Sequence, residues 1–326
     1  MSPRVSVIIP TKDRRAMLER SVASVLRQSF RDLEVIVVDD GPEVEPADWV
    51  ETLDPRIRHV RLEHSRGPSA ARNVGIRGST GAYIAFLDDD DEWYPDKLER
   101  QVRILDAAPS DVGVVYSGRE LRTPQGLVRL KAASGQGDIY DRLFGLMRGI
   151  PVHVDSMLVR RESLLDAGLF DEDIPFAEIW ELCVRLAKRW KFAAIPEPLI
   201  VQWRHPAGIS RDSARVIAGR RRIFEKHRAE VERHPEFDSL LHLTLGVHEL
   251  RRRNVAQARR DLARAIRVRP WNFKAVAYYL LSYDSAGVRE TFVRAWRLVS
   301  PRRRWLRGSA PRDARSRSPG RSGLAP

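Results

Sequence analysis

Residues 82–91 read AYIAFLDDDD, so six largely apolar residues pass directly into four aspartates. A short apolar run bounded by polar residues is typical of a buried strand. Adjacent carboxylates repel one another, and holding them beside a buried strand costs free energy unless a cation binds there. The sequence therefore predicts a divalent metal ion at residues 88–91.

Strand and helix patterns alternate before this point, as a parallel sheet with crossover helices requires. We expect strands at 5–9, 33–38, 57–62 and 82–87, and helices at 14–28, 47–53, 69–78 and 95–107. Polar residues follow every one of these strands, at 10–13, 39–41, 66–67 and 88–91. Ligands bind beyond the carboxyl ends of the strands in open sheets of this kind. The four polar groups together predict a ligand site at one edge of the sheet.

Beyond residue 111 the pattern changes to shorter strands and loops. We expect strands at 112–116, 157–160, 192–195 and 199–203, and helices at 161–167 and 177–189. Gly168 is typical of the position that ends a helix. Cys183 is the only cysteine in the sequence, which excludes an intrachain disulfide and fits a reducing compartment. It falls on the apolar face of the second helix, where we expect it to pack.

The net charge of +13 is unevenly distributed. Residues 215–326 hold 27 Lys and Arg against 10 Asp and Glu, or +17, which leaves 30 against 34, or −4, for residues 1–214. A basic region of this kind is attracted to anionic lipid headgroups or nucleic acid, and a solvated arginine-rich helix face is the alternative without a partner. Nucleic acid is the weaker candidate, because the region shows no clear interleaving of aromatic residues with its arginines and no recognisable nucleic-acid-binding module.

The C-terminal third is expected to be helical. Helices are predicted at 240–253, 254–268 and 273–283, with the spacing of tetratricopeptide-type hairpins, and a basic amphipathic helix at 288–298. We expect four aromatic residues to pack in the core of the hairpins: Trp271, Phe273, Tyr278 and Tyr279. The predicted organisation is an α/β domain at 1–212, a basic helical appendage at 213–306 and a disordered tail at 307–326.

No apolar run approaches the roughly 20 residues that a membrane helix needs. The N-terminus begins a strand pattern instead of a signal peptide. We therefore expect a cytoplasmic protein whose basic helices make peripheral contact with the anionic inner face of the membrane.

Five motifs in order resemble family 2 glycosyltransferases of the GT-A fold. They are VSVIIPTKDR at 5–14, VVDDG at 37–41, GPSAARNVGI at 67–76, FLDDDD at 86–91 and HPAGIS at 205–210. The resemblance covers about residues 4–212 and implies a mostly parallel, Rossmann-like sheet flanked by helices. It also implies inverting transfer of a sugar from a nucleotide-diphosphate sugar, with a UDP-sugar favoured, to a hydroxyl of a glycan or lipid-linked acceptor in polysaccharide and cell-envelope biosynthesis.

The resemblance assigns the nucleotide pocket to the first two motifs. Pro10, Thr11 and Asp13 would line the pocket. Asp40, together with Asp39, would accept a hydrogen bond from the edge of the base.

The third, fourth and fifth motifs would hold the diphosphate and the metal. Arg72 would face the nucleotide, with a salt bridge to a nearby carboxylate as its alternative role. Asp88 and Asp90 resemble the D-x-D pair that binds the ribose-diphosphate and an Mg²⁺ or Mn²⁺ ion, and His205 would approach the same metal. Such a cation stabilises the charge that develops on a departing diphosphate.

The other two aspartates receive secondary roles. Asp89 is assigned to the nucleotide pocket beside Asp88, unless it faces solvent. Asp91 is expected to cap the helix that begins near Pro95.

The sequence departs from the family where the catalytic base is expected. Residues 177–182 read AEIWEL, and Ile179 stands where the family has an aspartate. Isoleucine cannot take the proton from the acceptor hydroxyl. Glu178 is the first candidate to replace it, because it is adjacent and lies near a helix N-terminus where its charge is favoured. Glu181 is the second, because a spacing of three places it on nearly the same helix face.

Other interpretations remain open. The base could be Asp171 or Asp173, or the protein could be a scaffold that binds a nucleotide sugar without turnover. Acceptor choice would lie in residues 123–155, which show no recognisable pattern.

Overall fold

The computed structural model describes residues 2–41, 47–123, 126–132, 137–145, 152–203 and 212–283. Residues 1–282 form one compact unit, to which the following description refers. The predicted boundary at residue 212 falls inside this unit and stays a prediction. The predicted helix at 288–298, the predicted tail at 307–326 and the motif that contains His205 lie outside the described residues.

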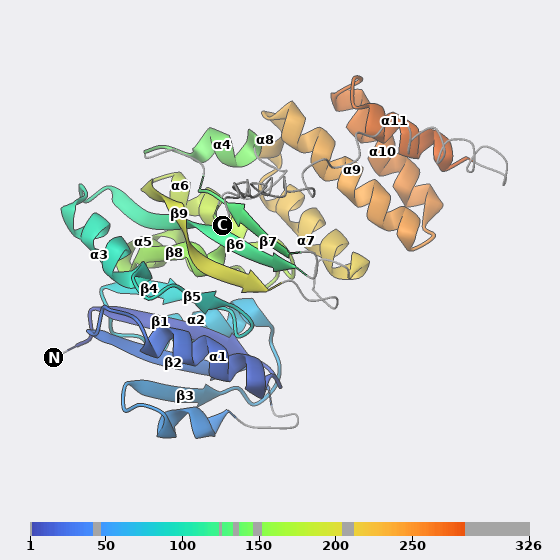
Figure 1. The fold of residues 1–326 in the computed structure, drawn as a ribbon. Coiled ribbons are helices and arrows are strands. Elements are labelled where there is room, and N and C mark those ends of the chain that lie inside the picture. Colours follow the sequence, from blue (N-terminus) through green and yellow to red (C-terminus); the bar gives the residue numbers. More distant parts are fainter. Residues whose placement is uncertain are drawn as a thin grey trace, which may run out of the picture. The chain divides into compact units, whose positions relative to one another are not determined.

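The described chain builds a mixed sheet flanked by helices (Figure 1). The first part consists of β1 (Val5–Thr11), α1 (Arg15–Leu26), β2 (Leu33–Asp39), η1 (Asp48–Thr52), β3 (Ile57–Arg61), α2 (Pro68–Gly78), β4 (Tyr83–Phe86), β5 (Glu92–Trp93) and α3 (Lys97–Ala107). The second part consists of β6 (Val112–Thr123), β7 (Gly126–Leu130), α4 (Tyr140–Gly145), η2 (Val154–Ser156), β8 (Met157–Arg160), α5 (Arg161–Ala167), α6 (Glu178–Ala187) and β9 (Lys191–Trp203). The helices α7 (Ser213–Lys226), α8 (Arg228–Glu232), α9 (Pro235–Arg251), α10 (Val255–Val268) and α11 (Phe273–Leu281) follow.

The strands run in the order β3-β2-β1-β4-β8-β6-β9-β5, and β7 pairs with β6. β1 is parallel to both β2 and β4, and β2 is parallel to β3. Thr11 pairs with Asp39 at the carboxyl ends of β1 and β2. β8 is antiparallel to β4 and β6, so the sheet is mixed beyond the first four strands. The predicted convergence of polar residues at one edge is therefore confirmed.

Side chains of the central strands pack alternately on the two faces of the sheet, because successive residues of a strand point to opposite sides. In β1, Ile8 packs into the core that includes α2, whereas Val7 and Ile9 pack into the core that includes α1. Helices cover both faces (Figure 1). Strands buried on both faces must be apolar throughout, so polar residues are left to the ends of the strands.

Two glycines position α2 against the sheet. A Cβ atom at Gly75 would lie 2.5 Å from Cγ2 of Ile8, so only glycine permits this close approach of helix and strand. Gly67 precedes the helix with a φ of 88°, a conformation that favours glycine. Pro68 then starts the first turn, where its missing N–H costs nothing. The helix that carries Arg72 is thereby held close to β1.

Several elements differ from the sequence-based expectations. β9 is one strand of 13 residues where two were expected, and β6 extends to Thr123 instead of residue 116. β7 and α4 lie in the region 123–155, for which the sequence showed no pattern, and η2 begins at the end of that region. Gly168 ends α5 with a φ of 87°, and Cys183 is buried, as expected. Burial raises the pKa of the Cys183 thiol to about 12, which fits a packing role.

The helical region has its own small apolar core. This core consists of Leu243, Leu262, Ala265 and Ala275. Tyr278 and Tyr279 pack against it and are half-buried, as expected. Trp271 and Phe273 are instead 77% and 70% exposed, so the expectation that they pack in the core of the hairpins is wrong. Both lie at the turn that joins α10 to α11, where their rings extend away from that core.

Candidate active site

The carboxyl ends of β1 and β4 are joined by a network of carboxylates and cations. The Thr11 hydroxyl donates to Oδ2 of Asp89 over 2.8 Å. Nη1 of Arg14 donates to Oδ1 of Asp89 over 3.1 Å and to Oδ2 of Asp90 over 3.3 Å. Asp89 is buried, so the alternative that it faces solvent is wrong. It connects the loop after β1 to the acidic loop, which we define as residues 88–91.

The backbone of the acidic loop rests on α1. Oγ of Ser21 lies 2.9 Å from the carbonyl oxygen of Asp88 and 3.0 Å from that of Asp91. Neither Ser21 nor Arg14 was assigned a role from the sequence. Arg14 belongs to the first family motif and could have been considered, whereas nothing distinguishes Ser21 from other polar residues of an amphipathic helix.

Arg72 joins the acidic loop to α6. The side chain is buried, and its Nη2 donates to Oδ1 of Asp88 over 2.6 Å while Nη1 donates to Oε1 of Glu178 over 3.2 Å. The salt bridge to a nearby carboxylate, the alternative role of Arg72, is therefore present. Burial and the nearby Asp155 raise the pKa of Asp88 against the opposing effect of Arg72. One guanidinium thus holds Glu178, the first candidate for the catalytic base, near Asp88.

A second group of possible metal ligands joins the last residue of the acidic loop to residues before β8. Ligand atoms of Asp91, His153 and Asp155 all lie within 4.8 Å of one another. The fully buried Asp155 accepts the Asp88 N–H at Oδ1 over 2.8 Å, and its Oδ2 lies 3.2 Å from Nδ1 of His153. His153 and Asp155 precede β8 in the stretch without a recognisable pattern, so sequence reasoning missed both of them.

Asp91 does not cap the next helix. Its Oδ1 accepts the backbone N–H of Trp203 over 2.9 Å, which connects the acidic loop to the end of β9. α3 begins at Lys97, two residues later than expected, and no side chain caps its N-terminus. The expected capping role was therefore wrong. Burial and the adjacent Asp155 raise the pKa of Asp91 well above its ordinary value.

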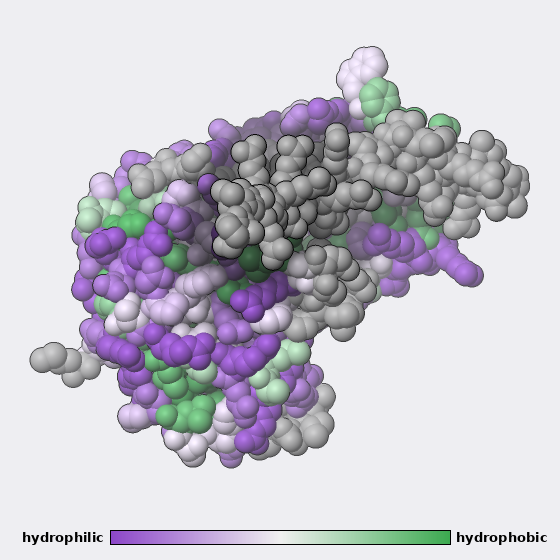
Figure 2. Space-filling view, viewed as in Figure 1, coloured by the Kyte–Doolittle hydropathy of each residue, from purple (hydrophilic) through white to green (hydrophobic). Residues whose placement is uncertain are grey.

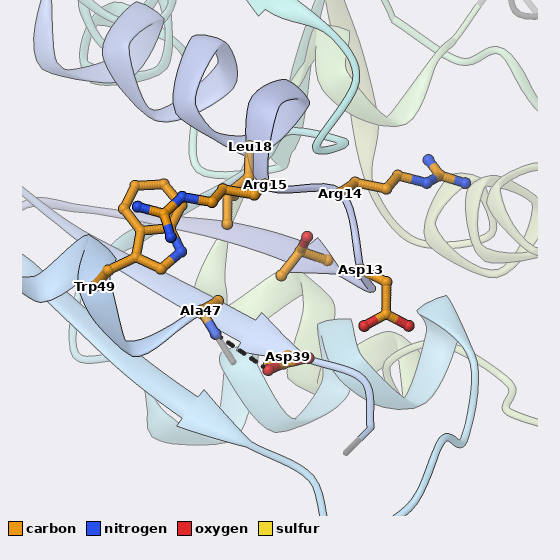
Figure 3. Close-up of a pocket in the computed structure, with 8 residues that line it drawn as sticks. Asp13, Arg14, Arg15, Leu18, Asp39, Ala47 and Trp49 are labelled. Carbon is orange, nitrogen blue, oxygen red and sulfur yellow. Dashed lines mark hydrogen bonds between the residues drawn. The ribbon is translucent and has the colours of Figure 1, made fainter. Parts of the chain in front are cut away.

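A pocket lies between β1, α1 and η1 (Figure 3). Its lining consists of Thr11, Asp13, Arg14, Arg15, Leu18, Asp39, Ala47 and Trp49. The close-up shows Asp13 and Trp49 at opposite ends of the pocket, with Asp39 between them (Figure 3). The Arg15 guanidinium lies over the Trp49 ring, 4.7 Å from its centre. The pocket therefore combines carboxylates with an aromatic wall.

The two aspartates that follow β2 have different environments. Asp39 lines the pocket, where its Oδ2 accepts the Ala47 N–H over 3.4 Å and burial raises its pKa. Asp40 accepts the backbone N–H groups of Arg66 and Gly67 over 2.7 and 2.9 Å and so holds the loop before α2. Of the pair, Asp39 is thus the one in the pocket.

Pro10 was also predicted to line the pocket. It lies buried within β1, where it pairs with Val38, and it is not among the residues of the pocket lining. Pro10 therefore supports the strand that carries Thr11.

Glu181 does not belong to the site. It is fully buried, and its carboxylate lies 2.7 Å from Nη2 of Arg185, 2.9 Å from Nζ of Lys226 and 3.0 Å from Nε2 of His227. Burial would raise its pKa, but the hydrogen bonds to His227 and Arg185, together with the charge of Arg185, lower the pKa to about 2. A carboxylate held in this way is a poor proton acceptor, so Glu181 is withdrawn as a candidate for the base. It connects α6 to the helices α7 and α8.

We expect Glu181→Gln to lower the free energy of unfolding by about 3 kcal/mol near neutral pH, because the pKa is lowered from 4.5 to about 2. A lowered carboxylate pKa contributes stability above pH 4.5 that is lost as the pH falls towards 2. The difference between variant and wild type in urea unfolding should therefore shrink between pH 6 and pH 3. Glu162→Gln, on an exposed position of α5, is the control, and an equal effect from it would contradict the prediction.

The part of the chain that forms the acidic loop, the pocket and the parallel strands also matches a known protein family. The family described as Glycosyl transferase family 2 matches residues 6–168, which is half of the chain. The chain belongs to glycosyl transferase family 2. The matched residues include every predicted nucleotide or metal residue except His205, which lies outside both the match and the described residues.

One curated relative is the succinoglycan biosynthesis protein ExoO of Rhizobium meliloti. It is 37% identical over 127 residues, which are 37% of this chain and 36% of that protein. The chain spans between 27% and 58% of the length of eight bacterial relatives that it matches.

Solved structures show the same fold. TarS residues 1–349 from S. aureus in complex with UDP-GlcNAc matches with a TM-score of 0.59 at 16% identity, covering 90% of this chain and 92% of that one. The mannosyltransferase PcManGT from Pyrobaculum calidifontis, in complex with GDP-Man and Mn²⁺, matches with a TM-score of 0.55 at 21% identity, covering 94% and 84%. The expected GT-A fold is confirmed.

None of the helices that the structure describes combines the length and the hydrophobicity needed to cross a membrane.

Proposed function

We propose that this protein is an inverting glycosyltransferase that moves a sugar from a nucleotide-diphosphate sugar to a hydroxyl of a glycan or lipid-linked acceptor. The observation that carries this proposal is the bridge made by Arg72, which holds Asp88 of the acidic loop and Glu178 of α6 on one guanidinium. A donor site and a candidate base are thereby brought together at the carboxyl edge of the sheet.

A divalent cation, Mg²⁺ or Mn²⁺, fits the acidic loop. Burial first, and then neighbouring carboxylates, raise the pKa values of Asp88, Asp89 and Asp91, against the opposing effect of Arg72 on Asp88 and of Arg14 on Asp89. A bound cation would stabilise the ionised form of these carboxylates. When bound, the cation would supply positive charge to the departing diphosphate. The Mn²⁺ in the complex of the related mannosyltransferase supports this assignment.

We propose Asp88 and Asp90 as its ligands. Their side chains are 30% and 25% exposed, so both can reach a ligand at the surface. Asp91 and Asp155 are buried and already accept backbone N–H groups, which favours a supporting role for them. His205, which the family resemblance places near the metal, remains part of the proposed site.

The nucleotide is proposed to bind in the pocket beside β1. Thr11 and Asp13 would line it, and the Asp39 carboxylate would accept an N–H from the edge of the base. Uracil, thymine and guanine present a ring N–H at that edge, whereas the ring nitrogen of cytosine is an acceptor that a carboxylate repels. The UDP-GlcNAc complex of the related TarS supports a UDP-sugar as the donor.

Glu178 is proposed to take the proton from the acceptor hydroxyl as that oxygen attacks the anomeric carbon. It is the first residue of α6, where the helix dipole favours its negative charge. Ile179 is half-buried and packs against the apolar core, and its alkyl side chain has no atom that could accept a proton. Asp171 is a weaker candidate because Lys226 donates to its carboxylate over 2.5 Å.

A second function is favoured by one observation, the isoleucine at position 179. A catalytically impaired protein of the same fold would bind the nucleotide sugar and act as a scaffold. A turnover assay over a panel of nucleotide sugars separates the two, because a scaffold releases no nucleotide in the presence of any acceptor.

The proposed acceptor and place of action are supported by one relative and by the charge of the C-terminal region. The name of ExoO, a succinoglycan biosynthesis protein, supports an acceptor from polysaccharide assembly. Many such acceptors are carried on lipid, so we propose a cytoplasmic protein held at the inner face of the membrane by its basic C-terminal helices.

Thermal unfolding with UDP, GDP, dTDP and CDP, each with and without Mn²⁺, tests the proposed function. A ligand at a hundred times its Kd stabilises the folded state by about 2.7 kcal/mol. We expect metal-dependent stabilisation by UDP and none by CDP. The absence of a shift with every nucleotide would contradict the assignment, and an equal shift with CDP would contradict the role of Asp39.

A further inference from the structure

We infer that the turn between α10 and α11 is a docking surface for an anionic lipid membrane. The surface consists of the exposed aromatic residues Trp271 and Phe273, the exposed Leu280, and the exposed basic residues Arg267 and Lys274. We call it the aromatic–basic surface. It is defined by residues for which the family resemblance implies no role.

The apolar part of the surface consists of large side chains that are normally buried but are exposed here. Trp271 and Phe273 are 77% and 70% exposed, and their rings form an edge-to-face pair with centres 6.5 Å apart. Leu280 lies two turns after Phe273, on the same face of α11, and is 55% exposed. Aromatic rings of this kind partition into the headgroup region of a bilayer. The side chains are thus placed to enter a membrane interface together.

The charge around these side chains selects an anionic partner. Residues 251–283 contain nine Lys and Arg and a single acid, Asp261. Asp261 is buried, and its carboxylate accepts from Nη2 of Arg221 over 2.9 Å. Arg269 pairs with the exposed Glu236 of α9 over 2.9 Å. The space-filling view shows hydrophobic and strongly hydrophilic side chains next to one another on this region (Figure 2).

A lipid membrane accounts for the aromatic and the basic residues of this surface better than a second copy of the chain or a nucleic acid does. A second copy of this chain would bring two surfaces of the same positive sign together, which electrostatic repulsion opposes. Nucleic acid would require aromatic side chains arranged along a groove for stacking on successive bases, whereas the two rings here contact each other at one turn. A bilayer with anionic headgroups takes up the rings and neutralises the arginines in a single plane.

The inference deepens the proposal that the acceptor is reached at the membrane, and it rests on that proposal for its biological meaning. Its test is independent of turnover, because vesicle binding requires neither donor nor acceptor. Failure of the docking surface and failure of the proposed activity are therefore distinguishable.

Co-sedimentation of the full chain with vesicles tests the inference, using pure phosphatidylcholine and phosphatidylcholine mixed with phosphatidylglycerol. We expect binding to the anionic vesicles that falls with salt. The double variant Trp271→Ala/Phe273→Ala should lose at least about tenfold in partition coefficient, because two large apolar side chains no longer enter the interface. Leu165→Ala, at a 53% exposed leucine of α5, is the matched control and should bind like wild type.

A second double variant and a charge-matched control test the basic residues of the surface. Arg267→Ala/Lys274→Ala should weaken binding to anionic vesicles. The control Arg77→Ala/Arg103→Ala, at exposed arginines of α2 and α3, changes the net charge by the same amount and should leave vesicle binding unchanged. Equal losses from both pairs, or binding that is indifferent to lipid charge, would overturn the inference. Tighter binding to a nucleic acid duplex than to vesicles, or conversion of a dimer to a monomer by the aromatic variant, would overturn it in favour of those partners.

Thermal unfolding of every variant, with and without UDP and Mn²⁺, shows whether the variant is folded and still binds the nucleotide. All the altered side chains are exposed, so the melting temperatures and the nucleotide-induced shifts should match wild type. A second aromatic variant, Trp271→Ser/Phe273→Ser, should reproduce the loss of vesicle binding if the alanine form unfolds.

Discussion

Glu178→Gln is expected to lower kcat by about 10²- to 10⁴-fold, the usual contribution of a general base. Glutamine has the size of glutamate and its carbonyl oxygen can still accept from Nη1 of Arg72, which lies 3.2 Å from Glu178. It cannot take a proton. Nucleotide release from a donor sugar in the presence of acceptor gives kcat, and calorimetric titration of UDP gives the affinity, which should stay close to that of wild type.

The matched control for this prediction is Asp173→Asn. Asp173 was an alternative base from the sequence, and its side chain is 75% exposed and paired with Arg222 on α7 over 3.2 Å. We expect the control to keep wild-type turnover. Retained turnover in Glu178→Gln together with lost turnover in Asp173→Asn would transfer the role to Asp173. A wild-type protein that binds UDP but turns over no donor sugar would support the scaffold interpretation instead.

Asp90→Asn is expected to weaken Mn²⁺-dependent binding of UDP at least about tenfold, or about 1.4 kcal/mol. The substitution removes one negative ligand and keeps an oxygen that can accept from Arg14, which lies 3.3 Å from Asp90. The fold should therefore be retained. Calorimetric titration with UDP, in Mn²⁺ and in a chelator, measures the effect.

Two further variants identify which carboxylates hold the cation. Asp96→Asn, at an exposed aspartate before α3 that makes no capping hydrogen bond, should bind UDP and Mn²⁺ like wild type. Asp155→Asn tests the group of Asp91, His153 and Asp155. If this variant loses the dependence on Mn²⁺ while Asp90→Asn keeps it, the cation lies in that second group and the proposed D-x-D ligands are wrong.

The parallel half of the fold could be predicted closely from the sequence. The expected strands and helices up to residue 107 agree with β1 to β4 and α1 to α3 within about two residues at most ends. Hydrophobic periodicity is a local property, and each strand of this half is followed by polar residues where it ends. The same reasoning missed β7, which pairs with the adjacent β6 but is largely exposed and so carries no apolar pattern. It also missed α4, whose Phe144 packs against Trp180 and Phe237, far away in the sequence.

The glutamates of α6 show where local reasoning fails. Glu178 and Glu181 lie one turn apart, and spacing alone placed them on nearly the same face. Glu178 contacts Arg72 of α2, whereas Glu181 contacts Lys226 of α7 and His227 after it. These partners are 45 to 106 residues away in the sequence. The helix pattern could not tell which glutamate faces the site.

The aspartates that follow the strands raise the same difficulty. From the sequence, Asp40 was expected to be the main hydrogen-bond partner of the nucleotide base, and Asp91 was expected to cap a helix. The structure uses Asp40 to hold the loop before α2 and Asp91 to hold the end of β9. A carboxylate at the end of a strand can accept from a backbone N–H, a cation or a ligand with equal ease, so its role depends on which groups folding brings to it.

By itself, the sequence determined the parallel sheet, the edge at which polar residues gather, the family and the acidic loop, because apolar period and strand order are encoded in neighbouring residues. The tertiary structure alone decided that Asp39 lines the pocket, that Arg72 joins Asp88 to Glu178, that Glu181 is buried among cations and that Trp271 and Phe273 are exposed. Each of these outcomes depends on contacts between elements far apart in the chain, and the free energy of such contacts is set by packing and burial that no local pattern records.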